Sequence, residues 1–195
     1  MVRRAVLFLG MMALAACVNG RDLNEPAVPL GDFSLGHNVV VAPHVARVPT
    51  SRELPVEDLI ASVQGAVEQR FGRYDGPKDY HFGLSIEGYN LAAPGVPVLL
   101  SPKTAMIVRL TVWDDAKGIK LNPEPAQFTV VEEFSGGNIV GSGLTKTAEQ
   151  QLEEISRNVA KTIENYLVGQ QEKFAWFTDA AEIDTGEREE VPLPR

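Results

Sequence analysis

Cysteine is almost absent from the 195-residue chain, which has one, Cys17, at the end of the apolar stretch AVLFLGMMALAAC. A single unpaired thiol is an oxidation liability in a secreted protein. It also leaves the chain without any cysteine-containing pattern of metal ligands. We therefore expect Cys17 to have a role other than redox chemistry, catalysis or metal binding.

Long apolar runs and a surplus of basic residues are also lacking. After residue 20 the longest apolar runs, such as VPVLL, are far shorter than the roughly 20 residues that cross a bilayer. The net charge is −8, and without residues 1–16 it becomes −10, from 16 basic and 26 acidic residues. No basic stripe interrupts this surplus, so we expect a body outside the bilayer and no nucleic-acid partner.

Only three histidines, His37, His44 and His81, are present as candidate bases or metal ligands. Their spacing matches neither HxH nor HExxH. His37 and His44 are expected to bracket a strand, which separates them in space. All three are interpreted as exposed or hydrogen-bonded structural residues.

Paired carboxylates occur at Asp114 and Asp115 and at Glu132 and Glu133, but neighbouring strand residues face opposite sides of a sheet. Neither pair can converge on one substrate, and a turn explains DDAKG. Serines lack a GxSxG setting, and the GSG at 141–143 lacks the lysine and helix of a phosphate loop. The sequence therefore predicts no catalytic residue, no cofactor and no metal, and a protein that is not an enzyme.

The first 16 residues are typical of a secretory signal. Arg3 and Arg4 precede an apolar stretch from Ala5 to about Leu14, and small residues precede Cys17. The stretch is too short for a spanning helix, so residues 1–16 are predicted to be removed. An ordinary secretory signal that happens to contain a cysteine is the alternative.

The four residues Leu14-Ala15-Ala16-Cys17 resemble the lipobox of bacterial lipoproteins. The resemblance implies that Cys17 carries a diacylglycerol thioether, becomes the mature N-terminus and is acylated on its amine, for example with palmitate. Two or three chains anchor stably, whereas one holds marginally. Val18, in place of an aspartate, implies the periplasmic side of the outer membrane, with the inner membrane as the alternative.

The segment 17–36 is polar, contains Pro26 and Pro29 and shows no period, so it is predicted to be a flexible tether. A single domain over 37–177 follows, beginning with a strand over 38–42. Apolar residues then recur at helical spacing from Val56 to Phe71, with Pro55 in the first turn and Gly72 at the end.

Strict alternation predicts strands through YHFGLSI (80–86) and AMIVRLTVW (105–113), with a turn at 115–118. A short extended piece over 98–100 and a hairpin through QFTVVEEFSGGNIVGSGLT are also expected. The last element is a helix with Thr147 and Gln150 as a capping box and Gly169 as its end. The fold class is therefore α+β: a two-layer sandwich of four to five mostly antiparallel strands, with two amphipathic helices on one face.

The C-terminal residues 178–195 hold six acidic and two basic side chains and are predicted to be a disordered acidic tail. Just before them stand Phe174, Trp176 and Phe177. These aromatic side chains either cover an open edge of the core or contact a partner.

The chain as a whole resembles uncharacterised lipoproteins of alphaproteobacteria, and its element order is similar to that of auxiliary lipoproteins of envelope ABC transporters. The resemblance rests on the lipobox and on the element order over residues 38–168. It implies a lipid-anchored periplasmic adaptor, with an envelope protein as partner, acting in envelope assembly, maintenance or transport. The alternative is a module that binds a small amphiphile or lipid in a pocket between sheet and helices.

Overall fold

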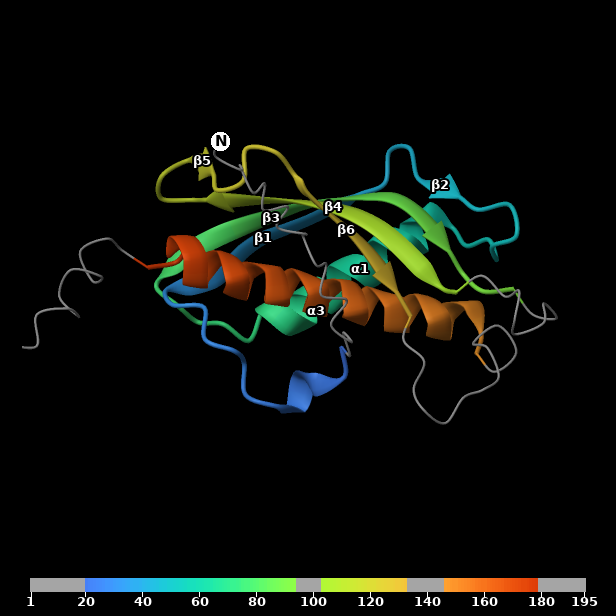
Figure 1. Cartoon of the computed structure of the whole chain (residues 1–195), viewed down its shortest axis with the longest axis horizontal. Coiled ribbons are helices and arrows are strands. Elements are labelled where there is room, and N and C mark those ends of the chain that lie inside the picture. The colour runs from blue at the N-terminus through green and yellow to red at the C-terminus, as the bar shows by residue number, and fades with distance from the viewer. Residues whose placement is uncertain (1–19, 94–102, 133–145, 179–195) are drawn as a thin grey trace, which may run out of the picture.

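The computed structural model describes residues 20–93, 103–132 and 146–178. In these ranges the sheet contains β1 (Phe33–Val41), β2 (Ala46–Arg47), β3 (Lys78–Asn90), β4 (Ala105–Asp114), β5 (Ile119–Lys120) and β6 (Ala126–Val131). A one-turn helix, η1 (Asp22–Asn24), precedes the sheet, and the two long helices are α1 (Val56–Phe71) and α3 (Ala148–Phe174). The predicted α+β class is confirmed, and both long helices lie on the same side of the sheet (Figure 1).

The sheet is mixed, where a mostly antiparallel one was expected. β3 and β4 form the antiparallel centre, and β5 and β6 both pair antiparallel with β4. β1 and β2 instead pair parallel with β3, because the chain crosses over through α1 before it returns as β3. The larger number of strands reflects the two-residue strands β2 and β5, which are too short to show a period in the sequence.

The core lies between the sheet and the helices, as the alternating patterns predict. β3 and β4 turn every second side chain toward the helices, and these side chains are almost completely buried: Tyr80, Phe82, Leu84, Ile86, Met106, Val108, Leu110 and Val112. The apolar stripes of α1 and α3 cover them. At about 25 cal/mol per Å² of apolar surface removed from water, this layer is the main source of stability.

The two long helices begin as predicted, but one ends later. α1 runs from Val56 and is capped by Gly72, whose N–H donates to the carbonyl of Glu68. α3 starts with the predicted capping box of Thr147 and Gln150. It continues past Gly169 to Phe174, with the side chain of Gln171 accepting the N–H of Phe177 at 2.8 Å, and it ends at Ala175, which has φ 50°. None of the helices in the described ranges combines the length and apolarity needed to cross a membrane.

The expected flexible tether is wrong for residues 20–36. Leu30 and Phe33 are buried in the core, and β1 begins at Phe33, five residues earlier than predicted. The ring of Phe33 lies 5.1–6.0 Å from those of Phe71, Tyr74, Tyr80, Phe82 and Phe177. Two apolar residues among prolines and polar side chains show no period, which is why the pattern missed them.

Several predictions fall on residues outside the described ranges. These are the signal segment with Cys17, the extended piece over 98–100, the second strand of the hairpin after β6, and the tail beyond Thr178. The turn after β4 is described and is confirmed: the N–H of Gly118 donates to the carbonyls of Asp114 and Asp115.

Candidate functional site

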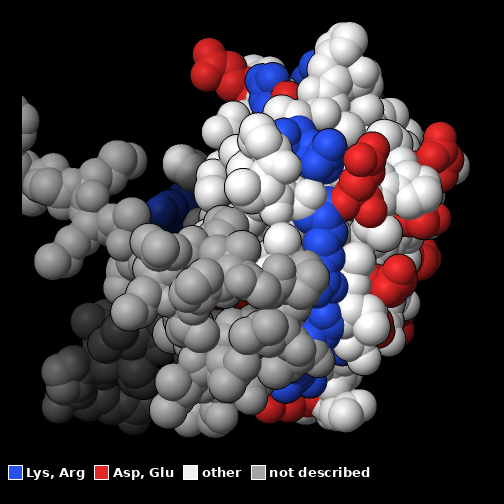
Figure 2. All heavy atoms as spheres, turned by 90° about the vertical axis from the view of Figure 1, so that its right-hand side faces the viewer, with Lys and Arg blue, Asp and Glu red and all other residues white. Residues whose placement is uncertain are grey.

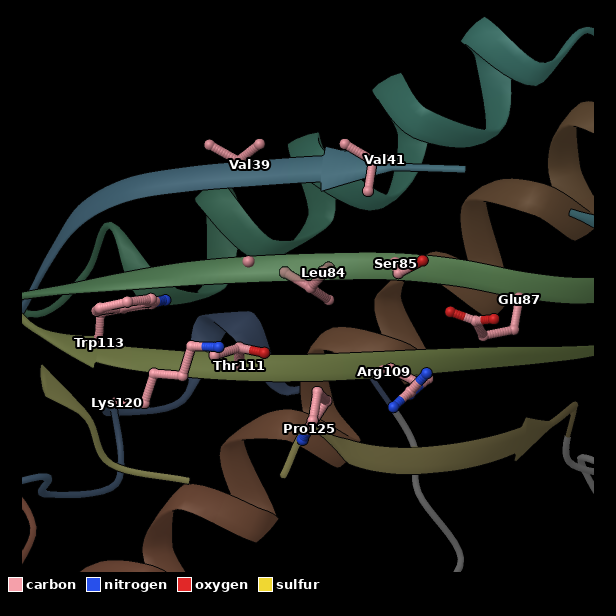
Figure 3. Close-up of a pocket in the computed structure, with 11 residues that line it drawn as sticks. Val39, Val41, Leu84, Ser85, Glu87, Arg109, Thr111, Trp113, Lys120 and Pro125 are labelled. Carbon is pink, nitrogen blue, oxygen red and sulfur yellow. The ribbon is translucent and has the colours of Figure 1, made fainter. Parts of the chain in front are cut away.

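The side of the sheet that faces away from the helices carries a groove of about 350 Å³ (Figure 3). Strands β1, β3 and β4 form its floor, and β5 and the segment before β6 form one side. The groove is lined by Val39, Val41, Gly83, Leu84, Ser85, Glu87, Arg109, Thr111, Trp113, Lys120 and Pro125. We refer to this surface as the open sheet face.

Three large apolar side chains are exposed in the groove. Val39 is 55% exposed, Val41 45% and Trp113 39%. Gly83 lies on β3, between Val39 of β1 and Thr111 of β4, and has no side chain, so the floor of the groove is low there. Exposed valines and a tryptophan gathered on one surface are typical of a binding site, since scattered single apolar residues are the normal condition of a surface.

A β-bulge in β1 turns these valines outward. Leu35 pairs with Tyr80, but Asn38 pairs with Phe82, so β1 has one more residue than β3 in this stretch. Upstream of the bulge, Leu35 packs toward the core; downstream, Val40 does so, and its neighbours point away. The extra residue therefore shifts the alternation by one position.

The bulge is stabilised by His81. Its Nδ1 accepts the backbone N–H of His37 at 2.9 Å, and its Nε2 lies 2.8 Å from Oδ1 of Asp115. A Cβ atom at residue 36 would lie 2.5 Å from the His81 ring, so only glycine fits there. Both ring nitrogens are engaged, which leaves His81 no lone pair for use as a base. His44 is exposed and lies elsewhere, so the three histidines do not converge.

Basic side chains border the apolar floor. Lys120 places its Nζ 5.3 Å from the centre of the Trp113 ring, a distance suited to a cation–π contact. Arg109 pairs with Ser85 across the strands and is exposed, while Glu87 is the acidic residue of the lining. In a chain of net charge −8, this groove is locally basic. Lysines and arginines also form a narrow row at one end of the molecule, where the sequence indicated no basic stripe (Figure 2).

Each described member of the two acidic pairs binds a different partner, so neither pair forms a common site. Asp114 is buried and binds Lys117 through the backbone N–H at 2.9 Å and through Nζ at 2.7 Å. Burial favours its neutral form, but these contacts outweigh that effect and hold the pKa of Asp114 below its usual value. Asp115 lies on the other side, against His81. Glu132 binds Lys146, and Glu133 is outside the described ranges. In the ranges 20–93, 103–132 and 146–178 no group of three or more acidic, histidine or cysteine side chains could hold a metal ion.

A second polar cluster, which the sequence analysis missed, lies between α1 and α3. Arg70 and Glu164 are each 1% exposed and form an ion pair at 2.8 Å. Glu164 also binds Arg73 at 3.2 Å, Lys161 at 2.7 Å and the hydroxyl of Tyr74 at 3.1 Å. Burial and the carboxylate of Glu164 raise the pKa of Tyr74 well above its usual value.

The sequence does hold a signal for this cluster. Arg70 follows the buried Val67 by three residues, and Glu164 follows the buried Ala160 by four. Both charged residues therefore lie on the apolar stripes of their helices. Opposite charges at two buried positions predict an ion pair, although 94 residues separate them.

The buried cluster fixes the chain N-terminal to β1, and we call these contacts the N-terminal clamp. Asp22 binds Arg70 at 2.5 Å and Lys161 at 2.6 Å. The N–H of Gly20 donates to Oδ1 of Asn158 at 3.1 Å, and its carbonyl accepts from Arg70 at 3.2 Å. Burial favours neutral Asp22, but the two cations hold the pKa of Asp22 far below its usual value.

The aromatic residues near the C-terminus separate into different environments. Phe177 is fully buried against Phe33 and Tyr80, so it is not available to a partner. Trp176 packs on the edge of the core and contacts Tyr166. Only Phe174 is exposed, at 66%, and it is the one of the three that a partner can reach.

No protein-family model matches the sequence, and no curated protein matches it. Solved structures that match in part include the PelC dodecamer from Paraburkholderia phytofirmans, at 9% identity over 70% of this chain and 92% of that chain, TM-score 0.35. Another is a DUF330 protein from Xanthomonas campestris, at 16% identity over 75% and 92%, TM-score 0.38. A minor lipoprotein from Acinetobacter baumannii matches at 13% identity over 71% and 96%, TM-score 0.31. At these scores the likenesses say nothing of function.

Proposed function

We propose that this protein is a non-enzymatic binding module, anchored by lipid at Cys17 on the periplasmic side of the outer membrane, whose open sheet face docks an envelope protein. The observation that carries the proposal is the difference between the two faces of the sheet. One face is covered by α1 and α3, while the other leaves Val39, Val41 and Trp113 exposed.

The occupant that fits is an acidic protein segment with apolar side chains. Valines and an indole ring can bury such side chains, and Arg109 and Lys120 stand beside them to pair with carboxylates. A small amphiphile fits less well. Small-molecule sites enclose 70–90% of the ligand surface, whereas the floor of this groove is itself about half exposed at Val39.

The described residues also argue against the pocket first considered for an amphiphile. Between sheet and helices they form a packed core, with Leu59, Val63 and Ile155 at 0% exposure. The hollow surface lies on the opposite face. Binding of a lipid or amphiphile would therefore have to use the open sheet face as well.

The test is site-specific photo-crosslinking in intact cells. A photoreactive amino acid replaces Thr111 in the groove, and a matched control replaces Gln69, an exposed residue of α1. We expect a protein adduct from position 111 that weakens with Arg109→Glu, and none from position 69. Equal adducts from both positions would contradict the docking surface. A copurified amphiphile without any protein adduct would support the alternative function.

The anchor is tested separately with a clickable palmitate analogue. Wild type should be labelled, and Cys17→Ser should not. Equal labelling of both would refute lipidation at Cys17 while leaving the docking surface intact.

A further inference from the structure

We propose that the side of the domain that carries the N-terminal clamp faces the lipid surface at close range, so that the open sheet face points away from the membrane. This inference rests on the proposed lipid anchor at Cys17. It adds an orientation, which an anchor alone does not define.

Chain length sets how far the domain can move from its anchor. Gly20 follows Cys17 by three residues, which span at most about 11 Å when extended. Without the clamp, the chain would be free up to Leu30, which is buried in the core, and 13 residues could span about 45 Å. The clamp therefore shortens the connection to the membrane about fourfold.

The first clamped residue fits closely against α3. A Cβ atom at residue 20 would lie 2.6 Å from the carbonyl carbon and oxygen of Arg157, so the backbone passes directly over the helix. Asn158 and Arg70 bind its N–H and carbonyl. Two residues later, Asp22 joins the ion pairs of Arg70 and Lys161, so the segment is held at two successive points.

The position of the clamp determines which face is turned to the membrane. Residues 20–25 lie against α1 and α3, on the helix side of the molecule, with η1 farthest from the sheet (Figure 1). The groove lies across the sheet from this side. A lipid surface within about 11 Å of Gly20 therefore meets η1 and the helices, and the groove is left accessible to a partner.

The experiment uses the full chain, processed in cells and purified in detergent. It is reconstituted into vesicles of phosphatidylethanolamine and phosphatidylglycerol, in which some lipids carry a fluorescence quencher. A thiol-reactive fluorophore is placed at Asn165→Cys, an exposed residue of α3 one turn after Lys161, or at Thr129→Cys on the exposed side of β6. With the Cys17 sulfur in its thioether, the introduced cysteine is the single free thiol. We expect several-fold stronger quenching at position 165 than at position 129.

A variant pair tests the clamp itself. Asp22→Asn removes the charge that binds Arg70 and Lys161 and should bring the two quenching values together. Glu25→Gln makes the same change at an exposed residue of the segment and should leave the difference intact. Circular dichroism confirms that each variant is folded.

The outcomes separate the two proposals. Equal quenching at both positions in protein that carries the palmitate label would overturn the orientation and leave the anchor standing. Absence of the label at Cys17 would overturn the anchor and the orientation together.

Discussion

Neutralising Glu164 is the most demanding test of the buried cluster. Its carboxylate is 1% exposed and accepts contacts from Arg70, Arg73, Lys161 and Tyr74. Glu164→Gln keeps the shape of the side chain and removes the charge. Among the residues that the structure describes, Arg70, also 1% exposed, then keeps only the partly exposed Asp22 as an anionic partner. Removing one member of a buried ion pair typically costs about 3–5 kcal/mol, and we expect about 3 kcal/mol because Asp22 remains.

This loss is large enough to measure in two ways. In a domain of this size, about 3 kcal/mol lowers Tm by about 6–12 °C. In urea, with a slope near 2 kcal/mol per M, the midpoint falls by about 1.5 M while the slope stays unchanged. Both measurements use the chain from residue 17 with Cys17→Ser, followed by far-ultraviolet circular dichroism.

The matched control is Glu153→Gln on the same helix. Glu153 pairs with Arg157 one turn away and its side chain is 65% exposed, so the same chemical change should cost less than about 0.5 kcal/mol. A double-mutant cycle of Arg70→Gln with Glu164→Gln should show strong coupling, since each single change leaves the other charge buried. If Glu164→Gln cost no more than Glu153→Gln, the reasoning about the buried cluster would be refuted.

Three further predictions concern other parts of the molecule. Gly36→Ala pushes the His81 ring out of place and should lower the free energy of unfolding by about 1–2 kcal/mol, measured in urea; an unchanged midpoint would show that the bulge does not depend on that contact. Phe177→Ala should cost about 3–5 kcal/mol, whereas Phe174→Ala should stay within about 0.5 kcal/mol, and similar losses would contradict their different burial. Asp22 has a lowered pKa, so its stabilising effect is complete above its ordinary value of 3.8 and is lost as the pH falls below it. The stability difference between wild type and Asp22→Asn should therefore shrink in acid, and a constant difference between pH 7 and pH 2.5 would count against the clamp.

Repeating patterns made the centre of this fold predictable. β3 alternates over seven residues and α1 keeps an apolar stripe over four turns, because each has one side on the core. The capping box at Thr147 was equally readable, since Ser, Thr and Gln at this spacing satisfy the first amides of a helix. Elements whose formation depends on neighbouring residues alone could therefore be predicted from the sequence.

Features that depend on distant parts of the chain were not predictable in this way. The clamp joins Gly20 to Asn158 across 138 residues, and no pattern near Gly20 indicates this contact. α3 continues past Gly169 although glycine is unfavourable in a helix, and Gln171 in its last turns binds the backbone of Phe177 beyond the helix end. The groove itself had no sequence signature, because its basic and apolar residues come from separate strands.

The bulge in β1 decides which valines of the strand face the core and which face the groove. Val39, Val40 and Val41 are chemically identical, so hydrophobicity alone gives no reason to bury the middle one and expose the other two. The alternation of the valines is set at the bulge before them, where Gly36 makes room for the ring of His81. A regular strand of the same residues, without the bulge, would have the same composition, yet it would bury Val39 and Val41 and expose Val40. The binding surface is thus encoded by the spacing of the valines from a glycine, and not by the valines themselves.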